Sequence, residues 1–159
     1  MKSIEEQISA IENGPWSQFS VVSRGERFAC WEGSISPQRN SLSRIRVGYL
    51  VPLPIRMWTI LEVQPRVQIL EPKLERHADY EEGPIPHVYP NSADPSLPFL
   101  CLFDPRAGEW SPSDLIAETT LYWAAKWLYF YDGWLITKTW RGGGKHYYRT
   151  AKEIGSHHP

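Results

Sequence analysis

Prolines crowd the stretch from Leu70 to Pro98, and this limits how the chain can fold more than any other feature of its sequence. Proline lacks a backbone N–H and restricts the residue before it, so a regular helix or central strand is not expected here. We expect a long, mostly irregular connection instead. Such connections in compact domains are usually functional or disordered, and this one leads directly to Cys101. The prolines are Pro72, Pro84, Pro86, Pro90, Pro95 and Pro98.

The residues ahead of this stretch open with a predicted helix at 3–13. Isoleucines recur at helical spacing from Ile4 to Ile11, which is typical of a face packed against a core. Ser3 is a suitable N-terminal cap, and the acidic residues of the first turn favour the positive end of the helix dipole. Gly14-Pro15 is expected to end the helix.

Three segments then have the pattern of strands, at residues 28–35, 44–52 and 57–69. The pattern is clearest in the second segment, where apolar and aromatic residues occupy every second position. Turns are predicted at 36–40 and 52–54, where Pro, Asn and Ser gather. A helix followed by an antiparallel meander indicates an α+β fold.

A second helix is predicted to begin at Ser111, which can cap it, with Pro112 at the first helical position and Asp114 at the third. We interpret the aromatic stripe from 123 to 134 as core rather than as a ligand platform, because it follows helical spacing. Residues 134–140 fit either a short strand or a continued helical layer. One face of the helix is formed by Ile116, Thr120, Trp123, Trp127 and Phe130.

A length of 159 residues suits one domain with a single core. We expect residues 1–149 to form this domain and residues 150–159 to be a flexible tail. A net charge of −1 gives no basis for attraction to nucleic acid or to an anionic membrane. We find no secretory signal and no apolar run near the roughly 20 residues that span a bilayer. A cytoplasmic protein is therefore expected.

No metal or cofactor is expected. Cys30 and Cys101 should be free thiols in that compartment, their separation matches no metal-finger spacing, and Cys30 should pack in the first predicted strand without a functional role. The pair His157-His158 is too isolated for the three or four ligands that zinc needs. The run from Gly142 to Lys145 lacks the ending and spacing of a phosphate-binding loop. Its glycines fit a turn or a contact with a partner.

The surroundings of Cys101 allow two interpretations. Because it stands between a polar loop and a predicted helix start, it suits a thiol nucleophile. The run from Phe99 to Phe103 also fits a buried strand in which cysteine is a small apolar residue. A thiol with a pKa of about 8.5 has a few per cent thiolate at neutral pH, so a nucleophilic Cys101 needs no permanent base.

Three short motifs occur in order around this cysteine: Pro90-Asn91, Cys101-Leu102 and Trp110-Ser111-Pro112. Together they resemble the active-site segment of ubiquitin-conjugating enzymes, and the resemblance extends from about Ser3 to Leu128. It implies an N-terminal helix, a four-stranded antiparallel meander, a proline-rich active-site loop and a shortened C-terminal helical layer. It also implies that the cysteine forms a thioester with the C-terminus of another protein.

Acyl transfer of this kind needs a donor for the oxyanion that develops at the carbonyl. The side-chain amide of Asn91 is the candidate, although Asn also favours turns without a catalytic duty. Tyr89 stands where the family has a histidine, and His87 lies two residues earlier. His87 could orient an attacking amine or accept its proton, or be a structural loop histidine. Asp104 is a similar but weaker candidate, since Asp-Pro favours a turn.

The segments His87–Pro90, Leu100–Phe103 and Trp134–His146 resemble the bacterial branch of this family, which is found in antiphage (CBASS) operons that signal through cyclic oligonucleotides. The resemblance implies a partner, a cGAS-like nucleotidyltransferase. Its C-terminus would be joined to Cys101 and could be passed to a target amine. Short operons of this type lack a fused activating-enzyme domain, and we expect none here.

Two other functions remain open. The altered turn around Tyr89 is compatible with a catalytically silent module that binds the same partner noncovalently through the proline-rich loop. A cysteine hydrolase that removes such conjugates, with Cys101 and His87, is the third possibility.

Overall fold

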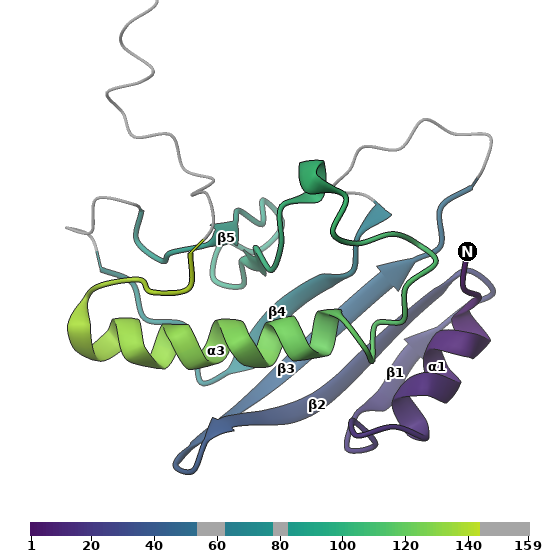
Figure 1. Cartoon of the computed structure of the whole chain (residues 1–159), viewed down its shortest axis with the longest axis horizontal. Helices are drawn as coiled ribbons and strands as arrows, with labels where there is room; N and C mark the ends of the chain where they lie inside the picture. The colour runs from purple at the N-terminus through teal and green to yellow at the C-terminus, as the bar shows by residue number, and fades with distance from the viewer. Residues whose placement is uncertain (54–62, 78–82, 144–159) are drawn as a thin grey trace, which may run out of the picture.

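A computed structural model of the chain describes residues 1–53, 63–77 and 83–143. These residues form an N-terminal helix, a four-stranded antiparallel sheet, a proline-rich connection and a C-terminal helix, which confirms the predicted α+β fold. Helix α3 (Thr120–Thr137) runs across one face of the sheet, and helix α1 (Ile4–Glu12) lies beside strand β1 (Ser20–Arg24) (Figure 1). The expected tail at 150–159 and the pair His157-His158 lie outside the described residues.

Helix α1 begins and ends within a residue of its prediction. The Ser3 hydroxyl accepts a hydrogen bond from the Glu6 backbone N–H at 3.2 Å, and the Glu6 carboxylate accepts one from the Ser3 N–H at 2.9 Å. This reciprocal capping satisfies two N–H groups that a helix start leaves without partners. Ile4, Ile8 and Ile11 are buried, as their spacing predicts.

The sheet has the strand order β1-β2-β3-β4, with β2 at Phe28–Gln38, β3 at Ser41–Leu50 and β4 at Arg66–Glu71. Strand β1 escaped prediction because four of its five residues are exposed, so apolar alternation is missing. The predicted strand at 57–69 is only partly right, since β4 begins at Arg66 and residues 57–62 lie outside the described part of the chain.

The core lies between the sheet and the two helices. Because side chains alternate along a strand, one face of each central strand is apolar and packs inward. Helix α3 contributes a complementary apolar face, and α1 adds its isoleucines. The innermost residues of the core include Trp31, Ile45, Val47, Val67, Leu121, Ala124, Leu128 and Trp134.

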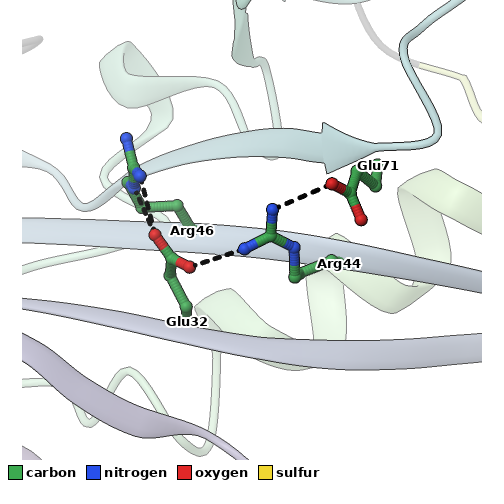
Figure 2. Close-up of polar contacts among 4 residues, drawn as sticks. All are labelled: Glu32, Arg44, Arg46 and Glu71. Carbon is green, nitrogen blue, oxygen red and sulfur yellow. Dashed lines mark hydrogen bonds and ion pairs between the residues drawn. The ribbon is translucent and has the colours of Figure 1, made fainter.

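An ion-pair network crosses the other face of the sheet (Figure 2). Glu32 on β2 accepts hydrogen bonds from Arg46 at 2.7 Å and from Arg44 at 3.0 Å, and Arg44 also donates to Glu71 on β4 at 3.0 Å. Glu32 lies opposite Arg46, and Arg44 lies opposite Glu71, in the strand register. Opposite charges at facing positions favour this register over a slipped one.

The second helix does not begin at Ser111 as predicted, but at Thr120. A helix from Ser111 would need the Ile116 N–H to bond to the Pro112 carbonyl. Instead, the Pro112 carbonyl accepts the Lys2 N–H at 2.7 Å, and Gln7 of α1 accepts the Ile116 N–H at 2.9 Å. Bonds to the N-terminal segment therefore replace the first turns of the expected helix.

Helix α3 instead includes the start of the segment 134–140, which fitted either a strand or a helix. It continues to Thr137 and ends at Lys138, which has a left-handed backbone with φ of 56°. Trp127 and Trp134 are buried in the core and Trp123 packs against it, as their interpretation as core residues predicts. Phe130 of the same stripe is instead half-buried and contacts Trp140, and Ile116, expected on the same helix face, is a buried residue ahead of α3. The backbone beyond Lys138 then turns back toward strand β5 (Val88–Tyr89) (Figure 1).

Candidate functional site

The site is built on a short antiparallel pair that ends the proline-rich connection. Strand β5 pairs with β6 (Phe99–Leu100), with Val88 opposite Leu100 and Tyr89 opposite Phe99. Val88 and Leu100 are buried, so the other two side chains occupy the opposite face. The chain leaves β6 at Cys101, which places this residue at the end of a fixed strand.

The loop between β5 and β6 is held by its own side chains. The Asn91 amide donates to the Leu97 carbonyl at 3.0 Å, and its oxygen accepts the Ala93 N–H at 3.2 Å. The Asp94 carboxylate accepts two hydrogen bonds from Ser96, which lower the pKa of Asp94. Asn91 thus acts within the loop as a turn residue does, and its support of an oxyanion stays a prediction.

The backbone of Cys101 is fixed by His87. The Cys101 N–H donates to the His87 carbonyl at 2.9 Å, and the indole N–H of Trp127 donates to the same oxygen at 3.0 Å. His87 has a φ of 50°, a left-handed conformation that is uncommon for a residue with a side chain. The carbonyl of His87 therefore links the backbone of Cys101 with Trp127 of helix α3.

The His87 ring is buried at 6% exposure and stacks on Trp140, with 4.9 Å between ring centroids and 23° between planes. This contact orients the imidazole toward the segment that follows α3. Its predicted action on an amine is not tested by this geometry and stays a prediction.

The thiol of Cys101 is half-buried and lies beside a tyrosine hydroxyl. Its Sγ is 3.2 Å from Tyr89 Oη and 3.8 Å from the Phe103 carbonyl oxygen. Burial raises the pKa of the thiol, the hydrogen bond with Tyr89 lowers it, and the charge of Asp104 raises it, with a net upward shift. The resting thiol is therefore less ionised than an ordinary cysteine.

The residues after Cys101 anchor it from the other side. The Phe103 ring packs on Trp123 of α3, with ring centroids 5.1 Å apart. Asp104 caps the short helix η1 (Pro105–Ala107) by accepting the Arg106 N–H at 2.9 Å. Asp104 thus serves the predicted turn, while its exposed carboxylate still acts on the thiol through its charge.

Trp110 of the motif Trp110-Ser111-Pro112 fixes the segment behind the site. Its buried indole meets Tyr49 of β3 edge to face, with 5.5 Å between ring centroids. Trp110 thus ties the segment after Cys101 to the sheet, while the motif itself does not open a helix.

Sequence reasoning gave no role to Tyr89 or Trp140, although both contact site residues. The contact of Tyr89 follows from the register of β5 and β6, which makes Tyr89 the diagonal neighbour of Cys101 on one face, within reach of an aromatic side chain. No such pattern connects Trp140 with His87, because their contact depends on where α3 ends.

A separate surface pocket of about 200 Å³ lies beside the β5–β6 loop. Its lining includes Val88, whose side chain points to the opposite face of β5 from Tyr89, and Cys101 does not line it. The thiol therefore does not face the pocket, although Asn91 does line it. Its lining residues are Arg76, Pro84, Ile85, Val88, Pro90, Asn91, Ser92, Pro95 and Pro98.

The remaining features considered in the sequence are the second cysteine, metal binding, a membrane span and the glycine run. Cys30 is a half-buried free thiol on β2, and burial raises its pKa. Within residues 1–53, 63–77 and 83–143, no group of three or more His, Cys, Asp or Glu side chains could hold a metal ion. No helix in those ranges has the length and apolar character to cross a membrane. Of the run Gly142–Lys145, the last two residues lie outside the description.

Comparison with known proteins places the chain in a family. No curated protein is found to match it. The family model described as Type II CBASS E2 protein matches residues 7–147, a range that includes the sheet, the β5–β6 pair, Cys101 and α3. The chain therefore belongs to the Type II CBASS E2 protein family.

Proposed function

We propose that Cys101 accepts the C-terminus of a partner protein as a thioester and passes it to an amine. The observation that carries the proposal is the position of the thiol: it follows strand β6 directly, its backbone is held by His87, and Sγ lies beside the Tyr89 hydroxyl. A nucleophile held on a rigid element can meet a carbonyl carbon in a defined orientation.

The chemistry needs two transfers. The Cys101 thiolate attacks the carbonyl carbon of an acyl group that another enzyme has activated, the S–C bond forms, and the leaving group departs with its bonding electrons. An amine then attacks the same carbon and loses a proton to water. The C–N bond forms, and the C–S bond breaks to return the thiolate.

The raised pKa of Cys101 is compatible with this sequence. A protonated resting thiol is protected from unwanted acylation and oxidation, since the thiolate is the reactive form. The small thiolate fraction limits the first transfer without preventing it.

The partner we propose is a cGAS-like nucleotidyltransferase of the same defence system. Membership of the Type II CBASS E2 family supports a partner among CBASS components. Attachment of its C-terminus to Cys101, and transfer to a target, would regulate antiphage signalling. We propose that this takes place in the cytoplasm.

The test is to express the chain with its genomic neighbours and to compare wild type with Cys101→Ser and Cys101→Ala. Wild type should yield an adduct that thiols release, and Cys101→Ser should yield an oxyester that resists thiols but yields to hydroxylamine. Cys30→Ala, which removes the other cysteine, should keep the wild-type adduct. An adduct that persists in Cys101→Ala would contradict the proposal.

A noncovalent binding module is the second candidate, favoured by the raised thiol pKa and by the engagement of the Asn91 amide within its loop. In that case Cys101→Ala would bind the partner and support phage defence as well as wild type does. Intact binding with lost defence would count against it.

A further inference from the structure

We propose that Tyr89 is a catalytic residue of the acyl transfer, whose hydroxyl donates a hydrogen bond to the carbonyl oxygen of the acyl group on Cys101. This inference rests on the proposed thioester chemistry at Cys101 and assigns it an oxyanion donor.

The first support is distance. Tyr89 Oη lies 3.2 Å from Cys101 Sγ. In a thioester the carbonyl oxygen and the sulfur are bonded to the same carbon, so a group that contacts Sγ can reach that oxygen when the carbonyl is turned toward it. An effective oxyanion donor lies roughly 2.7–3.1 Å from the oxygen it stabilises, which a small rotation of the tyrosine side chain can provide.

The second support is rigidity. Tyr89 belongs to β5 and faces Phe99 of β6, while Cys101 follows β6. The hydroxyl and the thiol therefore project from two paired strands, and the Cys101 N–H bond to His87 continues that pairing. A donor positioned before the reaction stabilises developing charge without reorganisation at the moment of transfer.

The third support is that the other candidate donor, the side-chain amide of Asn91, already makes hydrogen bonds within its loop. The amide of Asn91 donates to the Leu97 carbonyl, and its oxygen accepts the Ala93 N–H. An oxyanion role for Asn91 would need it to leave Leu97. The Tyr89 hydroxyl, in contrast, already contacts the sulfur and therefore lies at the reacting atoms.

The hydrogen bond would change direction through the cycle. In the resting protein the S–H group donates to Tyr89 Oη, and after ionisation the phenolic O–H donates to the thiolate. When a nucleophile attacks the acyl group, the carbonyl oxygen takes up negative charge and the O–H donates to it. As the C–S bond breaks, the charge returns to sulfur. Tyr89 keeps its proton throughout, so the transfer remains balanced.

The experiment uses the full chain as wild type, as Tyr89→Phe and as the control Tyr129→Phe, which alters an exposed tyrosine on α3. The probe is a synthetic glycine-ended peptide activated as a thioester of mercaptoethanesulfonate. Intact mass spectrometry follows acylation of Cys101 and, separately, discharge of the acylated protein by hydroxylamine. Alkylation by iodoacetamide across a pH range measures the thiolate fraction, and thermal unfolding verifies the fold.

We expect the rate of discharge of acylated Tyr89→Phe to fall by about 10- to 100-fold, with Tyr129→Phe unchanged. This loss is below the roughly 100- to 1000-fold cost of removing an oxyanion donor from an enclosed site, because Tyr89 is partly exposed. A structural role alone would change unfolding without this loss. If folded Tyr89→Phe is discharged at the wild-type rate, the role of Tyr89 is overturned. If the wild-type protein is not acylated at Cys101, the proposed function itself is overturned. Replacing Tyr89 with 3-fluorotyrosine, a stronger donor of similar shape, should keep or raise the rate, and a loss equal to that of Tyr89→Phe would also overturn the proposal.

Discussion

The indole of Trp140 stacks on the imidazole of His87 at a centroid distance of 4.9 Å, and the carbonyl of His87 accepts the backbone N–H of Cys101. Trp140, in the segment beyond α3, is therefore linked to Cys101 through His87. Trp127 strengthens the connection, because its indole contacts Trp140 and also donates to the His87 carbonyl.

Substitution of Trp140 should destabilise the domain and loosen this connection. Trp140→Ala removes contacts with His87, Trp127 and Phe130. Because the side chain is only half-buried, we expect a loss of about 2 kcal/mol, below the usual cost for a core tryptophan. Urea unfolding measures the change. Ile136→Ala, at a side chain that is 84% exposed near the end of α3, should stay within about 0.5 kcal/mol of wild type. Equal losses would show that Trp140 contributes no specific packing.

Gln7 should be among the most sensitive polar residues. It is fully buried, donates to the Asp114 carbonyl at 2.8 Å and accepts the Ile116 N–H at 2.9 Å. Gln7→Leu leaves both backbone groups without their partner, and we expect a cost of about 2–4 kcal/mol in chemical denaturation. The control is Gln18→Leu, since Gln18 is exposed and its side chain donates a single bond among the described residues, to the Ser34 carbonyl. If the two variants lose the same stability, the link between α1 and residues 114–116 is not important.

Reactivity of Cys101 should depend on pH in a defined direction. Its pKa is raised, so the midpoint of alkylation by iodoacetamide should lie above the value of about 8.5 for a free thiol. Asp104→Asn removes a negative charge that disfavours the thiolate, and should lower the midpoint. Glu118→Gln, at an exposed residue away from the thiol, is the charge-matched control. A midpoint that rises in Asp104→Asn would contradict the electrostatic account.

Alkaline pH should unfold the protein through two buried tyrosines. Burial raises the pKa of Tyr49 and of Tyr131 to about 12. An unfolded tyrosine ionises near pH 10, so the folded state holds these protons more tightly. Their stabilisation is complete below about pH 10 and is lost as the pH rises toward 12, by roughly 2–3 kcal/mol for each group.

Variants at these positions separate the two tyrosines. The Tyr49 hydroxyl is buried with no hydrogen-bond partner among the described residues, so Tyr49→Phe should keep or improve stability at pH 7 and reduce the alkaline loss. Tyr131→Phe removes the acceptor of the Glu75 N–H, 2.7 Å away, and should cost about 1 kcal/mol at pH 7. Thermal unfolding at pH 7 and pH 11 tests both statements, and an unchanged alkaline loss in Tyr49→Phe would contradict the first.

Local patterns were sufficient where the structure depends on local contacts. The cap at Ser3, the apolar face of α1 and the alternation in β3 follow from neighbouring residues, and all three were predictable. The start of α3 was not predictable. The first turns expected from Ser111 are replaced by bonds with Lys2 and Gln7, which lie more than a hundred residues away in the chain. Strand β1 has too few buried residues to show a pattern.

The candidate site also combines features that local sequence predicts with features that depend on distant contacts. Motifs in its own segment were sufficient to name Cys101 as the candidate nucleophile, which stays a prediction. The contact of its thiol with Tyr89 depends on the register of β5 and β6, and the contact of His87 with Trp140 depends on the end of α3. Neither is visible in local spacing, so the tyrosine was noticed only as a departure from the family pattern.

The most direct test of the central claim is to locate the covalent bond on the protein isolated from cells that express its genomic neighbours. Under nonreducing conditions, mass spectrometry of the digested adduct should find the peptide that contains Cys101 joined to the last residue of a partner, and thiol treatment should separate the two. A partner that co-purifies with wild type and with Cys101→Ala in equal amounts, with no bond at Cys101, would contradict the account.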